Sequence, residues 1–327
     1  MSKPKVFVTR NIPDKGFEVI KDFCDVDLWA DDLPPSRADL LQHVRGVDAL
    51  LCLLTDKIDA EVMDAAGAQL KVISNFAVGF DNIDVNAATA RKIPVGNTPD
   101  VLTDATADFA FALILSVGRY LLQGAQYARS GQWKTWNPML YLGVELKGAT
   151  LGLVGFGRIG KAMARRAMGF DMSVIYFDPN ETKADPDIKA TSVDFETLLA
   201  DSDFISLHTP LTADTHHLIG SESLAKMKPH AVLVNTSRGP VVDLEALYQA
   251  LKQGRIFGAG LDVTEPEPLP LDHPLFTLDN IIITPHIASA SKSARDKMSW
   301  MAAQNLIAGL KGEHLPNCVN PQLYQQK

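Results

Sequence analysis

The 327-residue sequence predicts an α/β protein with two parallel sheets, each flanked by helices. Two observations indicate this fold class. Short runs of β-branched residues alternate with helix-like segments, once within the first hundred residues and again from Thr150 onward. The length is also sufficient for two domains with separate hydrophobic cores.

The first alternation predicts a complete sheet by about residue 100. Its expected strands are Lys5–Thr9, Ala49–Leu54, Lys71–Asn75 and Pro94–Gly96. Between them, helical patterns occupy Asp14–Phe23, Arg37–Val44 and Ala60–Ala66. Because strands and helices alternate along the chain, the sheet is expected to be parallel, with helices against its faces.

A long apolar-rich helix is expected next, over Thr103–Leu122. The second alternation then predicts strands at Thr150–Val154, Ser173–Phe177, Phe204–Leu207, Ala231–Asn235, Gly258–Leu261 and Ile281–Thr284. Helices are expected to begin near Arg158, Val193, Ser221 and Asp243, and a final helix covers about Ser291–Lys311. The sequence therefore predicts a second α/β sheet.

Composition and charge exclude several classes of protein. The formal net charge of -8, with no Lys/Arg-rich block, argues against a nucleic-acid partner. The strongest apolar run, Phe109–Leu115, is too short to span a bilayer, and the N-terminus lacks the apolar core of a signal peptide. Cys24, Cys52 and Cys318 are scattered without metal-ligand or redox spacing, which favours a cytoplasmic protein.

A glycine-rich turn opens the second sheet. Gly155, Gly157 and Gly160 fit the G-x-G-x-x-G pattern of a Rossmann dinucleotide-binding domain, between an apolar strand and an amphipathic helix. Asp178 follows the next expected strand, where a carboxylate binds both ribose hydroxyls and repels a 2′-phosphate. NAD(H) is therefore expected rather than NADP(H). In the alternative interpretation the glycines form an ordinary turn and Asp178 is only a turn residue before Pro179.

Four further stretches carry a family resemblance. They are AVGFDNID at 77–84, NTSRGPVVD at 235–243, GAGLDVTEPEP at 258–268 and TPHIASAS at 284–291. With the glycine turn, they resemble the D-isomer-specific 2-hydroxyacid dehydrogenases in order along nearly the whole chain. Thr103–Thr106 and Trp136–Gly143 are similar to segments of the glyoxylate/hydroxypyruvate reductase branch.

The resemblance implies a particular domain organisation. A flavodoxin-like substrate-binding domain is expected to be discontinuous, at residues 1–100 and 288–327. The Rossmann NAD-binding domain, residues 101–287, is expected to be inserted into it. Segments that correspond to Phe109–Leu122 and Trp133–Leu142 form dimers in the family, so a homodimer is expected.

Three catalytic residues follow from the resemblance, and their chemistry fits. Arg238 follows an expected strand, and its planar fork suits the carboxylate and carbonyl oxygens of a 2-oxo acid. His286 can donate a proton to the carbonyl oxygen as hydride reaches the carbon. Glu267 would hold the His286 ring and favour its protonated form. Glu265 is a nearby rival, but the family spacing of five residues after Asp262 selects Glu267.

Other contacts are implied only by the resemblance. Backbone N–H groups of Val78 and Gly79 are expected to bind the substrate carboxylate. The expected cofactor contacts are Thr106, Arg158, Ile159, Pro210, Thr236 and Asp262, in addition to the glycine turn and Asp178. His208 is expected to line the cofactor cleft. His216 and His217 are interpreted as surface or packing residues, and no metal site is expected.

The function implied is NADH-dependent reduction of glyoxylate to glycolate and of hydroxypyruvate to D-glycerate, with His286 as proton donor. Another D-2-hydroxyacid dehydrogenase is an alternative, as is phosphite dehydrogenase, although the latter has a lysine where this chain has Val78. Formate dehydrogenases have glutamine at the position of Glu267. A different class, the NAD-sensing corepressor-like proteins, shares the Arg/Glu/His pattern and stays open.

Overall fold

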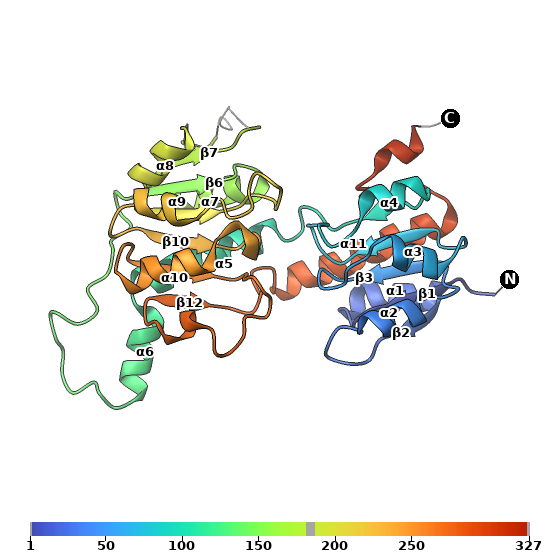
Figure 1. Cartoon of the computed structure of the whole chain (residues 1–327), viewed down its shortest axis with the longest axis horizontal. Coiled ribbons are helices and arrows are strands. Elements are labelled where there is room, and N and C mark those ends of the chain that lie inside the picture. Colours follow the sequence, from blue (N-terminus) through green and yellow to red (C-terminus); the bar gives the residue numbers. More distant parts are fainter. Residues whose placement is uncertain (1, 181–186, 326–327) are drawn as a thin grey trace. The chain divides into compact units, whose positions relative to one another are not determined.

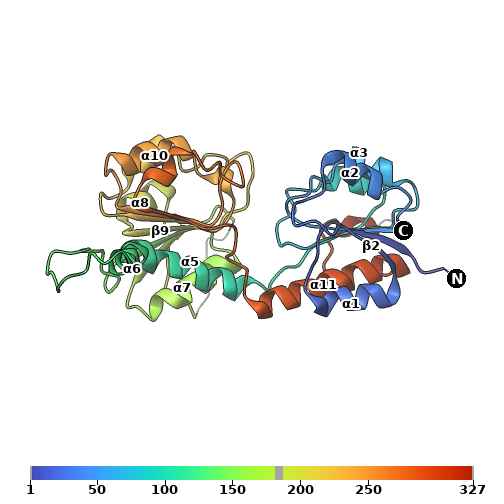
Figure 2. The same cartoon turned by 90° about the horizontal axis from the view of Figure 1, so that it is seen from below.

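The computed structural model describes residues 2–180 and 187–325 (Figure 1). The chain divides into two compact units. Unit 1 combines Met1–Leu102 with Ala290–Lys327, and unit 2 is Thr103–Ser289. Each unit is a parallel sheet with helices on both faces (Figure 2). The two-sheet α/β fold predicted from the sequence is therefore confirmed.

Unit 1 contains a five-stranded sheet in the order β2-β1-β3-β4-β5, which is the flavodoxin-like order. The strands are β1 (Lys5–Val8), β2 (Asp25–Leu28), β3 (Ala49–Cys52), β4 (Val72–Asn75) and β5 (Val95–Gly96). The helices are α1 (Asp14–Phe23), α2 (Arg37–His43), α3 (Ala60–Ala66), α4 (Val85–Ala90) and α11 (Lys292–Lys311). Figure 2 shows α1 and α11 on one face of this sheet, and α2 and α3 on the other.

The C-terminal helix α11 completes unit 1 although it is distant in sequence from the strands. Gly309 lies so close to β4 that an added Cβ would come within 2.5 Å of the Cβ of Val72. Further along the same strand, Ser74 Oγ donates a hydrogen bond to the backbone oxygen of Ala302, at 2.9 Å. This close approach buries β4 completely and ties the two sequence segments of unit 1 together.

Unit 2 contains a seven-stranded sheet in the order β12-β11-β10-β9-β6-β7-β8, with every pair parallel. From β8 to β11 this is the Rossmann order 3-2-1-4-5-6, extended by β12. The strands are β6 (Thr150–Val154), β7 (Ser173–Phe177), β8 (Thr191–Ser192), β9 (Phe204–Leu207), β10 (Val232–Asn235), β11 (Gly258–Leu261) and β12 (Ile281–Ile283). The helices are α5 (Thr103–Gly118), α6 (Leu121–Arg129), α7 (Arg158–Met168), α8 (Phe195–Asp201), α9 (Ser221–Lys226) and α10 (Leu244–Lys252).

The single helix predicted over Thr103–Leu122 is wrong at its C-terminal end. The backbone breaks at Tyr120, which adopts a left-handed conformation with φ 51°, and α6 begins at the next residue. The oxygen of Gly118 accepts a hydrogen bond from the backbone N–H of Val144, at 2.8 Å, instead of continuing the helix. A tertiary contact therefore ends α5.

Helices α5 and α6 are also the segment to consider as a possible membrane span. Among the residues that the structure describes, no single helix is both long and apolar enough to cross a bilayer. Helices α5 and α6 taken together are long and apolar enough to be a candidate span, but the two helices are bent by 60° relative to each other. Half of the residues of α5 are buried, most of them in the core of unit 2.

Candidate active site

The glycine turn joins β6 to α7, and the three glycines differ in how close their nearest neighbours lie. Gly155 has φ 92°, and an added Cβ would lie 2.6 Å from the backbone oxygen of His208. A Cβ on Gly160 would lie 2.3 Å from the oxygen of Gly155. By contrast, a Cβ on Gly157 would meet no described atom within 4 Å. The open space is thus at Gly157, the N-cap of α7, where a pyrophosphate can approach the helix N-terminus.

Asp178 lies directly beside this turn. Its Oδ2 accepts a hydrogen bond from the backbone N–H of Phe156, at 2.8 Å, within the glycine turn itself. Its Oδ1 accepts another from the N–H of Asn180, at 2.9 Å. The carboxylate is therefore both a turn residue after β7 and a negative charge at the cofactor turn, so the two interpretations of Asp178 are compatible.

The other expected cofactor contacts fall on several elements of unit 2. Arg158 and Ile159 form the first turn of α7, and Thr106 lies in the first turn of α5, which packs against α7. Pro210 follows β9 two residues after His208, whose oxygen contacts the glycine turn. Thr236 follows β10, and its buried Oγ1 has no hydrogen-bond partner among the described residues. An unpaired buried hydroxyl is unusual, and a bound ligand would satisfy it.

His286 and Glu267 form a close pair after the ends of β12 and β11. The Nδ1 of His286 donates to the Oε1 of Glu267 at 2.6 Å, a distance typical of a charge-assisted hydrogen bond. The side chains are 23% and 35% exposed, respectively, so both are partly shielded from water. Because Nδ1 is engaged, the other ring nitrogen, Nε2, can face a substrate.

Glu265, the rival carboxylate, faces a different histidine. Its Oε2 lies 3.4 Å from the Nε2 of His217. Glu267 also accepts a hydrogen bond through Oε2, from the backbone N–H of Thr264 at 3.4 Å. Each of the two glutamates in the Glu-Pro-Glu-Pro segment therefore faces a different histidine.

Asp262 holds the loop that presents His286. Asp262 is only 1% exposed. Its carboxylate accepts hydrogen bonds from Thr284 Oγ1 at 2.7 Å, from Ile287 N at 2.8 Å and from Ala288 N at 2.7 Å. The backbone N–H of His286 also donates to the Asp262 oxygen, at 3.0 Å. The sequence analysis did not anticipate this positioning role. The cofactor contact of Asp262 that the resemblance implies stays a prediction.

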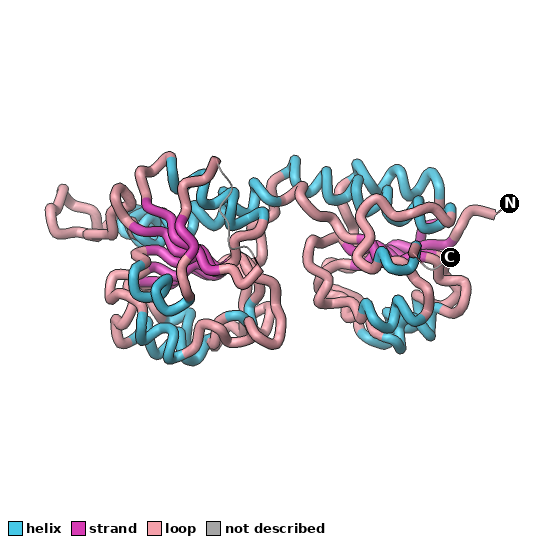
Figure 3. The backbone as a smooth tube through the Cα atoms, turned by 90° about the horizontal axis from the view of Figure 1, so that it is seen from above, coloured by secondary structure: helices cyan, strands magenta, loops and turns pink. Residues whose placement is uncertain are grey.

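Arg238 follows β10, the neighbour of β11 in the sheet. The parallel register aligns Asn235 with Leu261, and Leu261 with Ile283, so β10, β11 and β12 end at one level. The loops that carry Arg238, Glu267 and His286 therefore leave the same edge of the sheet. Figure 3 shows the strands of each sheet joined by loops to helices on both faces. An added Cβ on Gly239 would lie 1.9 Å from the oxygen of Thr264, so the first two of these loops touch directly.

The expected substrate loop belongs to unit 1, where it follows β4. Two side-chain amides fix its backbone: Asn75 Nδ2 donates to the oxygen of Gly79, and Asn97 Nδ2 donates to the oxygen of Val78, each at 2.8 Å. The Val78 oxygen shares its peptide plane with the Gly79 N–H, so its hydrogen bond fixes the direction of that N–H group. The Val78 N–H shares its plane with the Ala77 oxygen, which accepts a hydrogen bond from Thr98 N at 2.9 Å. The sequence analysis found Val78 and Gly79 but missed the two asparagines, each of which ends or directly follows a strand.

His208 is chemically unsuited to the role of proton donor. Its Nε2 lies 2.9 Å from Ser206 Oγ, and its Nδ1 is buried without a partner among the described residues. Burial lowers the pKa of His208 to about 3. The imidazole is therefore neutral near neutral pH, which does not suit a proton donor.

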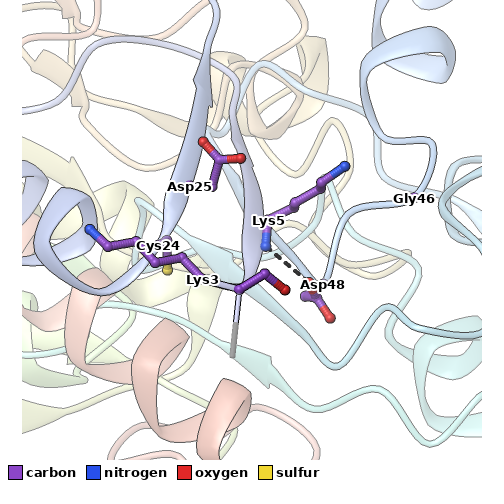
Figure 4. Close-up of a pocket in the computed structure, with 7 residues that line it drawn as sticks. Lys3, Lys5, Cys24, Asp25, Gly46 and Asp48 are labelled. Carbon is purple, nitrogen blue, oxygen red and sulfur yellow. Dashed lines mark hydrogen bonds between the residues drawn. The ribbon is translucent and has the colours of Figure 1, made fainter.

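Unit 1 also contains a surface hollow of ≈ 520 Å³ (Figure 4). It is lined by Lys5, Asp25 and Asp48, at or next to the first residues of β1, β2 and β3. Ligands of open parallel sheets bind at the opposite, carboxyl ends of the strands. The N–H of Lys5 already donates to the Asp48 carboxylate at 2.9 Å, and burial raises the pKa of Cys24 to about 11. We therefore do not assign the active site to this hollow.

Comparisons with known proteins show the family to which the chain belongs. Residues 111–288 match the family described as D-isomer specific 2-hydroxyacid dehydrogenase, NAD binding domain. The glyoxylate reductase of Thermococcus litoralis is 54% identical over 323 residues, which cover 97% of each chain. The chain belongs to the D-isomer-specific 2-hydroxyacid dehydrogenase family. Within that family, the glyoxylate reductase of Thermofilum pendens is also 54% identical, over 328 residues that cover 99% of this chain and 96% of the relative.

Two solved structures are similar to this chain over nearly its whole length. The crystal structure of the TT0316 protein from Thermus thermophilus has a TM-score of 0.91 and 48% identity, over 96% of this chain and 99% of that one. A second is the NADPH-dependent glyoxylate/hydroxypyruvate reductase of Sinorhizobium meliloti, in complex with NADP and malonate. Its TM-score is 0.86 at 34% identity, over 97% of both chains.

Proposed function

We propose that this dehydrogenase reduces small 2-oxo acids with NADH, converting glyoxylate to glycolate and hydroxypyruvate to D-glycerate. The observation that carries the proposal is the 2.6 Å pair of His286 and Glu267, beside the strand that presents Arg238. Relatives at 54% identity bear the name glyoxylate reductase, which supports the choice of substrate.

In the proposed mechanism, the bound nicotinamide supplies the hydride to the carbonyl carbon. The guanidinium of Arg238 binds the substrate carboxylate and polarises the carbonyl oxygen. His286 donates the Nε2 proton to that oxygen, which becomes the hydroxyl of the product. Glu267 orients the imidazole through Nδ1 and stabilises its cationic form until the proton is transferred. Unit 1 is proposed to contribute the backbone N–H groups of Val78 and Gly79 to substrate binding.

The cofactor is proposed to be NADH rather than NADPH. Asp178 would accept hydrogen bonds from the ribose hydroxyls and repel a 2′-phosphate. Family membership does not decide this point, because the Sinorhizobium meliloti relative is named as NADPH-dependent. Residues proposed to complete the cofactor site are Gly155, Gly157, Gly160, Arg158, Ile159, Thr106, Pro210, Thr236 and Asp262.

We further propose that unit 1 binds the substrate, that unit 2 binds the cofactor and that the enzyme is a homodimer. Large apolar side chains are exposed on α6 and on the segment after it: Leu121, Leu122, Trp133, Trp136, Met139 and Leu142. Trp136 alone is 79% exposed. A patch of this kind is typical of a protein–protein interface. We also expect a cytoplasmic enzyme.

The test is to follow oxidation of NADH and of NADPH with glyoxylate, hydroxypyruvate, pyruvate and 2-ketogluconate in parallel. We expect the highest kcat/KM with NADH and with glyoxylate or hydroxypyruvate. Preference for pyruvate or 2-ketogluconate would indicate a different D-2-hydroxyacid dehydrogenase. Reduction of NAD⁺ with phosphite would favour phosphite dehydrogenase. Binding of NADH without turnover of any of these substrates would favour an NAD-sensing binding protein.

A further inference from the structure

Two adjacent histidines and a glutamate from a distant segment meet on the surface of unit 2. The rings of His216 and His217 stack with their centroids 4.0 Å apart and their planes at 28°. The carboxylate of Glu265, 48 residues further along the chain, lies 3.4 Å from His217. One ligand-type atom from each residue lies within 4.8 Å of the others. The sequence analysis interpreted the two histidines as surface or packing residues because no carboxylate was apparent nearby.

The backbone on both sides of this cluster is fixed by other contacts. His217 has a left-handed φ of 51°, and its N–H donates to the oxygen of Pro240 at 2.7 Å. Pro240 belongs to the short η1 helix (Gly239–Val241), and Gly239 contacts the backbone of Thr264, next to Glu265. The histidines and the glutamate are therefore connected through three segments that already touch one another.

We infer that His216, His217 and Glu265 form a binding site for a divalent transition-metal ion such as Zn²⁺, with water completing the coordination. Two imidazoles and one carboxylate are ligands that suit zinc, copper and nickel, whereas Mg²⁺ and Ca²⁺ prefer oxygen ligands alone. Zinc bonds of about 2.0–2.1 Å put neighbouring ligand atoms about 3.4 Å apart in a tetrahedron. The three residues are exposed, so their side chains can rotate to close the remaining gap.

The proposed metal site is adjacent in sequence to the pair formed by Glu267 and His286. Only Pro266 separates Glu265 from Glu267, whose Oε1 holds His286 at 2.6 Å. A metal ion that binds Glu265 to the two histidines restrains the segment on which Glu267 lies. We expect bound Zn²⁺ to lower the turnover number. This second step rests on the proposed reductase function, whereas metal binding itself does not.

Calorimetric titration of the full chain without a histidine tag tests the site. Zn²⁺ is expected to bind with one ion per chain, and excess Mg²⁺ is not expected to compete. His217→Ala and Glu265→Gln should each weaken Zn²⁺ binding by at least about tenfold, because loss of a ligand costs no less than loss of a supporting residue. His230→Ala is the matched control, since His230 also lies on the surface of unit 2 beside a carboxylate, at 2.8 Å from Asp203.

Two results would overturn the assignment. In the first, the His217→Ala and Glu265→Gln variants bind Zn²⁺ as tightly as the unchanged protein does. In the second, only Glu267→Gln weakens Zn²⁺ binding, which would place the ion at Glu267 and His286. For the effect on turnover, saturating Zn²⁺ should lower kcat of the unchanged enzyme but not of His217→Ala. Calorimetric binding without any change in kcat would refute the restraint on Glu267 and leave the site standing. Absence of reductase activity before zinc is added would instead be a failure of the proposed function.

Discussion

Replacing Glu267 by glutamine tests how the catalytic histidine is supported. The change removes a negative charge but keeps the length of the side chain and a carbonyl oxygen that can accept from His286 Nδ1. What is lost is the negative charge that accepts the 2.6 Å hydrogen bond from the ring proposed to donate the proton. We therefore expect Glu267→Gln to lower kcat/KM for reduction while the protein stays folded.

The magnitude follows from the geometry of the pair. A hydrogen bond to a charged group contributes about 1.5–3 kcal/mol, roughly twice the contribution of a neutral one. Because Glu267 is 35% exposed, solvent screening favours the lower end of that range. Because the glutamine retains a neutral hydrogen bond, about half of this contribution is lost, or about 0.8 kcal/mol, which corresponds to a decrease of about fourfold in kcat/KM. His286→Ala removes the proton donor itself and should lower reduction by about a hundredfold or more.

Glu265→Gln is the matched control, because it makes the same chemical change two residues earlier. Its carboxylate faces His217 instead of His286, so kcat/KM should stay within about twofold of the unchanged enzyme. The assay is initial-rate oxidation of NADH with varied glyoxylate at saturating cofactor, and thermal unfolding checks that each variant is folded. An equal or larger loss in Glu265→Gln would show that the assignment of the two glutamates is wrong.

Three further predictions concern the cofactor, the substrate loop and acid stability. Asp178→Ala should narrow the preference for NADH over NADPH, mainly by weakening NADH binding; a wild-type preference for NADPH of about tenfold or more would contradict this. Asn97→Ala removes the donor to the Val78 oxygen and should raise KM for the 2-oxo acid by about two- to tenfold, with KM for NADH as the control. The pKa of His208 is lowered from 6.5 to about 3 in the folded protein, so only the unfolded chain protonates it between those two pH values. The free energy of unfolding should therefore fall as pH drops below about 6.5, by up to about 1.4 kcal/mol per pH unit from this residue. His208→Gln should reduce that slope in urea titrations, and an unchanged slope would contradict the burial of the neutral ring.

The strands that the sequence predicted are mainly those buried on both faces. Positions in β3, β4, β9 and β10 are buried throughout, and such strands appear in a sequence as uninterrupted apolar runs. The edge strand β2 was missed because it reads Asp-Val-Asp-Leu, with no position fully buried. The edge strand β8 has only two residues, both exposed. The edge strands β5 and β12 were predicted, because their residues are mostly apolar and at least partly buried, so it is polarity and exposure rather than edge position alone that weaken the signal.

The predicted site residues depended on motifs, and the additional ones depended on tertiary contacts. Gly155, Gly157 and Gly160 could be interpreted from spacing because all three lie within one βα turn, although the close contact of Gly155 is with His208, after β9. The partner of Glu265 could not, because His217 is 48 residues away and reaches it only after β10 and β11 have paired. Asp262 appeared in the sequence as one polar residue at a strand end, whereas its three hydrogen bonds come from the loop after β12.

Strand register and one buried carboxylate together determine where the catalytic candidates lie. Because β10, β11 and β12 are parallel neighbours that end at one level, the residues after them must leave the same edge of the sheet. Register alone does not orient a flexible loop, and His286 additionally requires a left-handed φ of 54°. The four hydrogen bonds that Asp262 accepts from residues 284 to 288 hold that conformation, one through its backbone oxygen and three through its carboxylate. These features position His286, the proposed proton donor, without any side chain that selects between substrates, so under that proposal discrimination among 2-oxo acids must come from other residues.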